Sequence, residues 1–307
     1  MSKDNQINND NYINRRIYKP VPLLDGIEEI RQDFEERIAQ GDTTYGIEIF
    51  DDCVETIRNG SVTFIIAAPN VGKSLWGLTI ATNLAKQNKR VLICSCEMGA
   101  GLLMERQLKN LTGISTGELR QLYTNHRDNA NMIMDSVIEG KQYEYLKKID
   151  ICETGGATVE DLITMFDCFP EFEYIIVDYI QRVRGTGTEY ENITNAAREL
   201  QTYARRTGRK FIICSQASRA SNDAGKFGSS IDTGRIRGKG SGSIEEDADV
   251  GLTLMELEEG GSRKILATLF KNRYGNRKNI TYKYRLDSRL CLILEDKNYI
   301  PERSKEK

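Results

Sequence analysis

The chain has 307 residues, of which 39% are apolar and 29% are charged, and its formal net charge at pH 7 is −2. A chain of this length can bury one large core or two small ones, and this composition excludes an intrinsically disordered protein. The apolar runs are far shorter than the roughly 20 residues that cross a bilayer. The Asn-rich start also lacks the apolar stretch of a secretory signal. We therefore expect a cytoplasmic protein with no membrane partner.

The seven cysteines and the single histidine exclude several kinds of site. Seven cysteines are too few for a disulfide scaffold in a chain of this size, and no pair has CxxC spacing. Cys94 and Cys96 share one face of a predicted strand, which is typical of buried, reduced thiols. The lone His126 argues against a histidine-based metal cage and against a Ser-His-Asp triad.

The chain begins with a polar segment and a helical pattern. Residues 1–20 are rich in Asn and Asp and predict a disordered tail. Ile27, Ile30, Phe34 and Ile38 then recur at helical spacing, which predicts one amphipathic helix within residues 21–42. The apolar stripe of such a helix must be covered, either by its own domain or by a neighbouring subunit.

From residue 43 to residue 300 the pattern is that of one α/β domain, followed by a short tail at 301–307. Strands are predicted at 62–67, 90–96, 149–152, 174–177 and 211–214, and helices at about 75–84, 102–108, 159–166 and 196–203. This alternation predicts a mostly parallel sheet with helices on both faces. Further strands at 250–255, 264–270, 280–285 and 290–294 predict an antiparallel C-terminal extension.

A Gly/Ser-rich segment from Gln216 to Ile244 interrupts this rhythm. Five basic residues are spread through it: Arg219, Lys226, Arg235, Arg237 and Lys239. A connection of this length in a compact domain is usually functional or disordered. From Arg263 onward, 13 Lys plus Arg stand against 5 Asp plus Glu. We interpret the segment as a mobile loop that contacts an extended polyanion, with plain disorder and a solvated basic face as the alternatives.

One segment between a predicted strand and a predicted helix fits the phosphate-binding P-loop pattern, with Ala in place of the first Gly. It consists of Ala67, Ala68, Pro69, Asn70, Val71, Gly72, Lys73 and Ser74. In this motif backbone N–H groups and a helix N-terminus surround the phosphates. The Lys73 ammonium would reach the phosphate oxygens and the Ser74 hydroxyl would bind Mg²⁺. The segment therefore predicts binding of ATP with Mg²⁺.

Three polar side chains follow other predicted strands of the same sheet. Asp178 ends a strand about a hundred residues downstream, where P-loop proteins place a carboxylate that orders the Mg²⁺ shell. Glu97 closes the second strand and is placed to orient or deprotonate an attacking water, although a helix-start carboxylate is the alternative. Gln216 could sense the γ-phosphate and relay its state to the loop that follows.

Lys271 and Arg273 end a strand of the C-terminal extension. Phosphoryl transfer develops charge that a guanidinium stabilises, often one supplied by another subunit. The spacing alone fits a surface turn equally well. The residues by themselves thus predict a P-loop ATPase with a basic mobile loop.

Six segments occur together in an order and at a spacing that one known family shares. They are APNVGKS, VLICSCEM, YIIVDYIQ, FIICSQASR, KGSGSIEEDADV and FKNRYGN. Over roughly residues 45–294 they resemble the RecA-like ATPase domain of the DnaB-type replicative helicases. The resemblance implies a RecA-like P-loop core and an ATP-driven, Mg²⁺-dependent helicase. It also implies assembly into a ring, a homo-hexamer, that moves 5′→3′ along single-stranded DNA.

The resemblance assigns a role to each matching residue. Lys73 would hold the phosphates, Ser74 and Asp178 would order Mg²⁺, and Glu97 would be the catalytic glutamate. Gln216 would link the γ-phosphate to the DNA-binding loop.

Other matches imply contacts beyond a single chain. Lys271 and Arg273 would act in trans on the neighbouring subunit's ATP, and the helix over residues 24–38 would dock on that neighbour. The residues expected to touch the DNA backbone are Arg219, Lys239, Gly240 and Gly242.

Two features depart from the family pattern. Gly240 stands where the family commonly has an acidic residue. Only about 45 residues precede the predicted core, so we expect a short, phage-like form without the helical N-terminal domain that contacts primase. A helicase loader or primase remains an expected partner. The alternatives are a RecA- or RadA-like recombination or repair ATPase, and a KaiC-like assembly ATPase that needs no nucleic acid.

Overall fold

The computed structural model describes residues 22–217, 244, 246–259, 262–275, 279–296 and 302–303. The chain divides into two compact units, Met1–Asp42 and Thr43–Lys307. Within the first unit, a 3-10 turn over Leu23–Asp25 leads into helix α1 (Gly26–Gln40). The predicted disordered tail at 1–20 lies outside the described residues.

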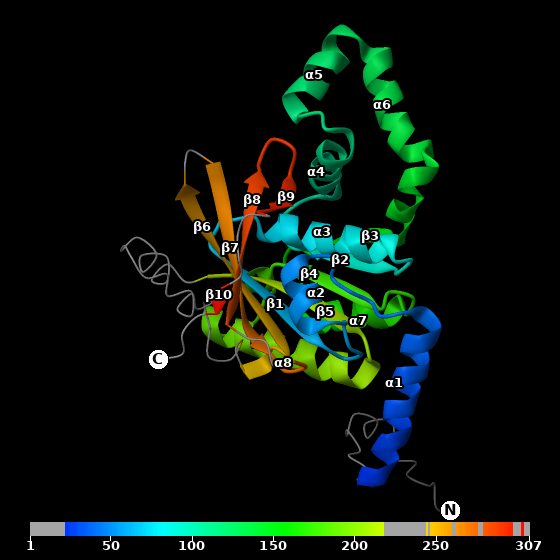
Figure 1. The fold of residues 1–307 in the computed structure, drawn as a ribbon, viewed down its shortest axis with the longest axis vertical. Coiled ribbons are helices and arrows are strands. Elements are labelled where there is room, and N and C mark those ends of the chain that lie inside the picture. The colour runs from blue at the N-terminus through cyan, green and yellow to red at the C-terminus, as the bar shows by residue number, and fades with distance from the viewer. Residues whose placement is uncertain are drawn as a thin grey trace, which may run out of the picture. The chain divides into compact units, whose positions relative to one another are not determined.

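The second unit is organised around one mixed sheet (Figure 1). Its described strands run in the order β10-β8-β7-β6-β1-β5-β4-β2-β3, with β9 beside β8. Their bounds are β1 Val62–Ala67, β2 Val91–Ser95, β3 Ile149–Glu153, β4 Tyr174–Asp178, β5 Lys210–Gln216, β6 Val250–Glu259, β7 Ser262–Asn272, β8 Ile280–Asp287, β9 Leu292–Glu295 and β10 Glu302–Arg303. The strands from β6 to β3 pair in parallel, and β7 to β10 add antiparallel pairs. This confirms the predicted fold class.

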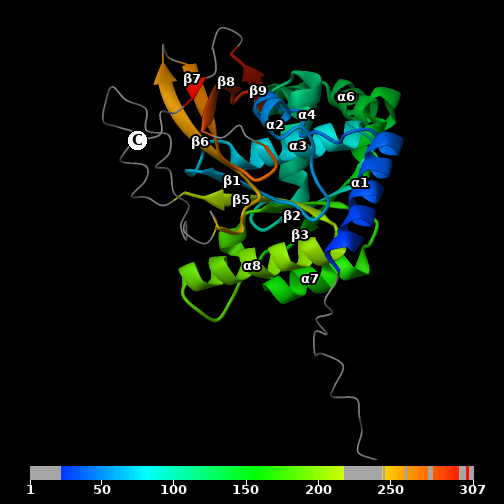
Figure 2. The ribbon, with the colours of Figure 1, turned by 60° about the horizontal axis from the view of Figure 1, so that its bottom comes forward.

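Helices cover both faces of the sheet, as Figure 2 shows for α2 and α3 on one face and α7 and α8 on the other. Among the described residues of this unit, the α-helices are α2 Glu48–Val54, α3 Lys73–Lys86, α4 Ala100–Thr112, α5 Thr116–Asn125, α6 Arg127–Glu139, α7 Val159–Cys168 and α8 Glu189–Thr207. Because strand side chains alternate, β1 contributes Ile65 to the core under α3 and Phe64 to the core over α8. All six β1 residues are buried, which places this strand at the centre of the molecule.

The structure adds helices that the sequence pattern did not predict. The predicted helix at 102–108 is the middle of α4, and it is followed by α5 and α6, which form a hairpin beyond the sheet (Figure 1). A capping box between Ser115 and Glu118 begins α5. No residue of α5 is buried. Glu302–Arg303, inside the predicted tail, pair with β8.

In the described part of the chain, no helix combines the length and the apolar character needed to cross a membrane.

Candidate nucleotide site

The P-loop joins the central strand β1 to α3. Asn70 and Gly72 both have positive φ, 65° and 106°, and the value at Gly72 is one that side-chain-bearing residues rarely adopt. These two residues turn the chain between the end of β1 at Ala67 and the start of α3 at Lys73. The amino end of a 14-residue helix, with its unpaired N–H groups, therefore faces the edge where the parallel strands end.

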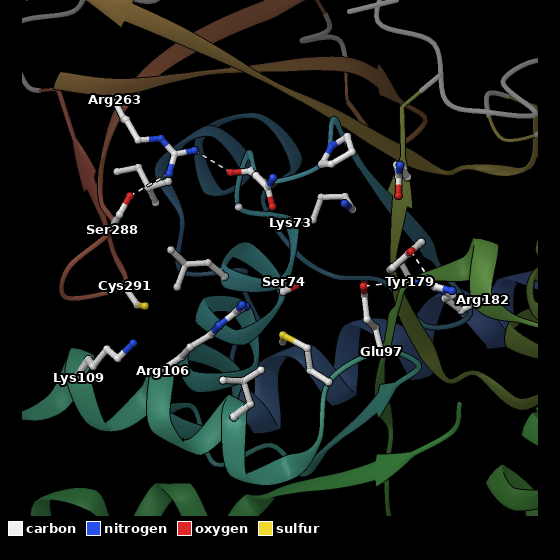
Figure 3. Close-up of a pocket in the computed structure, with 18 residues that line it drawn as sticks. Lys73, Ser74, Glu97, Arg106, Lys109, Tyr179, Arg182, Arg263, Ser288 and Cys291 are labelled. Carbon is white, nitrogen blue, oxygen red and sulfur yellow. Dashed lines mark hydrogen bonds and ion pairs between the residues drawn. The ribbon is translucent and has the colours of Figure 1, made fainter. Parts of the chain in front are cut away.

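A cavity of about 970 Å³ opens over this helix end. Figure 3 shows Lys73, Ser74 and Glu97 around its centre, and Arg263, Ser288 and Cys291 at the side of the C-terminal strands. This volume lies at the upper end of the usual range for ligand pockets, roughly 300–1,000 Å³. The cavity therefore has room for a nucleoside triphosphate.

Lys73, which lines the cavity, and Asp178, which lies beside Lys73 and Ser74, are both buried. The Lys73 ammonium lies 5.2 Å from the centre of the Tyr179 ring. Burial raises the pKa of Asp178, while a hydrogen bond from Ser74 and the charge of Lys73 act in the opposite direction. Its atom Oδ1 makes no hydrogen bond with the described residues. A buried carboxylate oxygen without a donor, beside a hydroxyl, fits a Mg²⁺ ion.

Glu97 lies two residues beyond the end of β2 and remains half-exposed to the cavity. Its carboxylate is 3.6 Å from Nη2 of Arg182. The Arg182 Nε in turn donates to the Tyr179 hydroxyl at 2.9 Å. Glu97 is thus held at the rim by a cation, with its oxygens accessible to solvent. Neither Tyr179 nor Arg182, which both line the cavity, was predicted from the sequence as a site residue.

Gln216 is the last residue of β5 and pairs with Ala67, the last residue of β1. Its N–H donates to Oε1 of Gln181 at 3.0 Å, and its carbonyl accepts from Nε2 of the same side chain at 3.1 Å. The Gln181 amide also donates to the Ser215 hydroxyl. Gln181 therefore fixes the backbone at the end of β5, next to the P-loop strand.

Three basic residues that the sequence analysis missed line the other side of the cavity. Arg106 and Lys109 lie one turn apart on α4. Arg263 on β7 donates to the carbonyl of Asn70 in the P-loop at 2.7 Å and to the Ser288 hydroxyl at 2.9 Å. The spacing of Arg106 and Lys109 on one helix face was a usable signal. No local sequence pattern indicated Arg263, because its partner Asn70 is 193 residues away in the chain.

Lys271 and Arg273 are not brought to this cavity. Lys271 pairs with Gly251, which is level with Phe64, and Arg273 donates its N–H to the carbonyl of Asp249 below that level. At about 3.3 Å per residue, Arg273 lies roughly 16 Å along the strand direction from Ala67. The pair therefore occupies the opposite edge of the sheet from the P-loop of the same chain.

The four residues expected to touch DNA lie outside the described residues. They are Arg219, Lys239, Gly240 and Gly242.

The chain is similar to known proteins over most of its length. The sequence model of the DnaB-like helicase C terminal domain matches residues 43–289, so the chain belongs to this family of RecA-like ATPase domains. A probable plasmid replicative DNA helicase of Chlamydia muridarum is 29% identical over 244 residues, which cover 75% of this chain and 50% of the relative. The replicative DNA helicase DnaC of Bacillus subtilis is 28% identical over 246 residues, with the same coverage.

Solved structures support the same fold. One of them, an isolated ATPase domain, superimposes with a TM-score of 0.73 at 18% identity, and the match covers 90% of this chain and 99% of that chain. A DnaB-like replicative helicase, solved in a study of its interactions with primase, gives a TM-score of 0.69 at 18% identity, with 90% of this chain and 67% of that chain covered. The chain spans about half the length of the curated relatives it matches.

Proposed function

We propose that this chain is an ATP-driven DNA helicase that assembles into a ring, a homo-hexamer, and translocates 5′→3′ on single-stranded DNA. Its membership of the DnaB-like helicase family supports the activity. The observation that carries the assembly is the separation of the P-loop cavity from Lys271 and Arg273 at opposite sheet edges. Arg106, Arg182 and Arg263 line the cavity of one chain, whereas Lys271 and Arg273 lie away from it and would act on the nucleotide of a second copy.

Within one chain, the buried residues hold the nucleotide and Glu97 acts on water. Lys73 and the N–H groups at the start of α3 would neutralise the phosphates, and Ser74 and Asp178 would hold Mg²⁺. When bound, the ion would supply further positive charge at the phosphate oxygens. The Glu97 carboxylate, open to the cavity, would orient the attacking water and accept its proton.

The step that couples hydrolysis to DNA would start at Gln216. Its backbone is clamped by Gln181 next to the P-loop strand, and the Gly-rich loop with Arg219, Lys239, Gly240 and Gly242 follows directly in the sequence. Basic side chains and backbone N–H groups in such a loop would grip the DNA phosphates without regard to base sequence.

Helix α1 would hold neighbouring subunits together. Its apolar stripe is exposed, at 48% for Ile27, 54% for Ile30 and Phe34, and 84% for Ile38. An apolar stripe of this kind is unfavourable in water and is stabilised when a second copy covers it. A loader or primase would then act on the assembled ring.

An ATPase assay with and without single-stranded DNA tests the proposal. We expect turnover that rises with added DNA, together with displacement of one strand of a forked duplex. ATP turnover that stays the same with and without single-stranded DNA would favour a KaiC-like assembly ATPase. DNA-stimulated turnover without strand displacement, with filaments rather than rings in electron micrographs, would favour a RecA- or RadA-like recombination or repair ATPase.

A further inference from the structure

One buried carboxylate, Asp249, organises the sheet edge that lies opposite the P-loop. It directly precedes β6 and is only 2% exposed. Its N–H donates to the carbonyl of Val62 at 2.9 Å, and its Oδ2 accepts from the N–H of Val62 at 3.0 Å. Both the main chain and the side chain of Asp249 are therefore locked onto the first residue of the central strand β1.

The same residue also holds Arg273 twice. Its Oδ1 accepts from Nη1 of Arg273 at 2.7 Å, and its carbonyl accepts from the Arg273 N–H at 2.9 Å. The Arg273 side chain nevertheless remains 47% exposed. Its guanidinium is thus anchored from the inside of the molecule while half of the side chain faces solvent.

The chemistry of this pair favours orientation over simple charge neutralisation. A charge-assisted hydrogen bond to a guanidinium is short and directional, and 2.7 Å fits that description. A guanidinium carries five N–H donors in one rigid plane, so a single anchored donor fixes the direction of the others. A second cation, Arg205 on α8, lies 3.7 Å from the same carboxylate oxygen. Asp249 therefore does not depend on Arg273 alone for a positive neighbour.

We propose that Asp249 is the positioning residue for Arg273 in ATP hydrolysis between subunits. By holding one edge of the guanidinium plane at the start of β6, it would direct the remaining N–H donors outward, toward the nucleotide of the neighbouring copy. This inference rests on the proposed function, in which Arg273 acts in trans. The competing role is a purely structural ion pair that closes the edge of the sheet.

Mixed oligomers separate the two roles. A Lys73→Ala chain retains Arg273 but has a defective P-loop, whereas an Arg273→Ala chain retains its P-loop but has no guanidinium to give. Turnover in their mixture therefore comes only from interfaces where the Lys73→Ala chain supplies Arg273 to the nucleotide bound by the Arg273→Ala chain. If this parent mixture recovers no turnover above either chain alone, the proposed action in trans fails, whatever Asp249 does.

The substitution Asp249→Asn is then placed in one chain at a time. The Asn oxygen can still accept from the Val62 N–H, but the charge that aligns Arg273 is lost. On the Lys73→Ala chain we expect kcat of the mixture to fall at least about tenfold, with KM for ATP within about twofold. On the Arg273→Ala chain, where Asp249 has no guanidinium to orient, we expect less than a twofold change.

Equal losses in the two arrangements would overturn the proposal, because a structural role weakens either chain. No loss in either arrangement would overturn it as well. Glu173→Gln on the Lys73→Ala chain is the matched control, since it removes the ion pair with Lys210 at the same sheet edge. If the Asn variant does not fold, Asp249→Glu keeps the charge but displaces it by one methylene, and the same one-sided loss is expected.

Discussion

At the scale of single residues, the buried carboxylate of Asp178 carries an electrostatic cost that a bound ion would remove. Burial raises its pKa, so the folded state binds the proton more tightly than the unfolded chain does. The free energy of unfolding should therefore fall as the pH rises from about 3.9, the ordinary value for Asp, through the raised pKa, and then level off. Asp178 thus lowers the stability of the nucleotide-free protein at neutral pH.

Asp178→Asn should therefore raise the melting temperature of the nucleotide-free protein at pH 8 while abolishing Mg²⁺-dependent ATP hydrolysis. The difference in melting temperature should shrink as the pH is lowered toward 4, where the folded carboxyl binds a proton and the carboxyl of the unfolded chain begins to do so as well. The fluorescence of Trp76, the single tryptophan, follows the unfolding. A variant that melts below the wild type at pH 8 would contradict this account.

Arg263 makes a contact whose loss should affect ATP binding. Its guanidinium donates to Asn70 in the P-loop and to Ser288 near β8, and it forms an ion pair with Glu256. Arg263→Ala should raise KM for ATP roughly three- to tenfold, because the P-loop loses the hydrogen bond that holds it against the C-terminal strands.

Arg263→Lys should restore little of this loss, since an ammonium lacks the planar fork that reaches several partners at once. The matched control is Arg289→Ala, which removes an exposed ion pair with Glu118 outside the cavity. Steady-state ATP hydrolysis at fixed Mg²⁺ measures KM for ATP in these variants and in the control. An unchanged KM in Arg263→Ala would mean that the P-loop holds its conformation without this contact.

At the scale of elements, the sequence predicted the segments that carry a continuous or regularly spaced set of apolar residues. The strand Val62–Ala67 is buried throughout, and its predicted bounds agree with the structure. Helices α5 and α6 were not predicted from the sequence. They bury few residues: α5 has no buried residue, and α6 has Ala130 and Val137. A helix that buries few residues needs few apolar positions, so its apolar periodicity is weak; α1 was predicted because its stripe, although exposed, is regular.

The residues of the candidate site also fall into two groups, those that a local sequence motif predicts and those that it does not. Lys73, Ser74 and Asp178 belong to local motifs with a known spacing, and the structure brings them together at the strand ends. Contacts such as Arg263 with Asn70 depend on how β7 passes the P-loop in three dimensions. Such a contact joins residues far apart in the chain, and no local pattern of residue types encodes it.

Helix α1 offers a prediction at this scale, because its apolar stripe is exposed. Phe34→Glu should reduce the oligomer to smaller species and lower ATP turnover at least tenfold, since the stripe would then carry a charge into the contact with a second copy. Light scattering coupled to gel filtration measures the mass.

The unit Thr43–Lys307 should keep its melting temperature in this variant, because Phe34 belongs to the other compact unit. Glu35→Gln, which alters a charged neighbour on α1, is the control and should leave the mass unchanged. If the Phe34→Glu oligomer persists at the same mass, the stripe is not the contact that joins the subunits.

At the scale of the whole molecule, the residues proposed to act in ATP hydrolysis lie at two opposite edges of one sheet. The P-loop and Gln216 lie where the parallel strands end, whereas Arg273 lies where β1 begins. In the proposed ring, the two edges of each subunit would take part in two different nucleotide sites. A subunit whose own P-loop is empty would still supply Arg273 to its neighbour, so the proposed sites would act in sequence around the ring.

The proposed movement along DNA would further require contacts that depend on charge and do not depend on base sequence. Lys239→Ala should weaken binding of single-stranded DNA by a similar factor for all base compositions. It should also reduce the slope of log K against log salt by about 0.7 to 1, because one phosphate contact no longer releases a counterion. Fluorescence anisotropy of labelled oligonucleotides between about 50 and 200 mM salt measures the slope.

Lys147→Ala, remote from the loop in sequence, is the control with an unaltered slope. If Lys239→Ala leaves the slope unchanged as well, this lysine does not contact the DNA backbone and the grip must come from other residues.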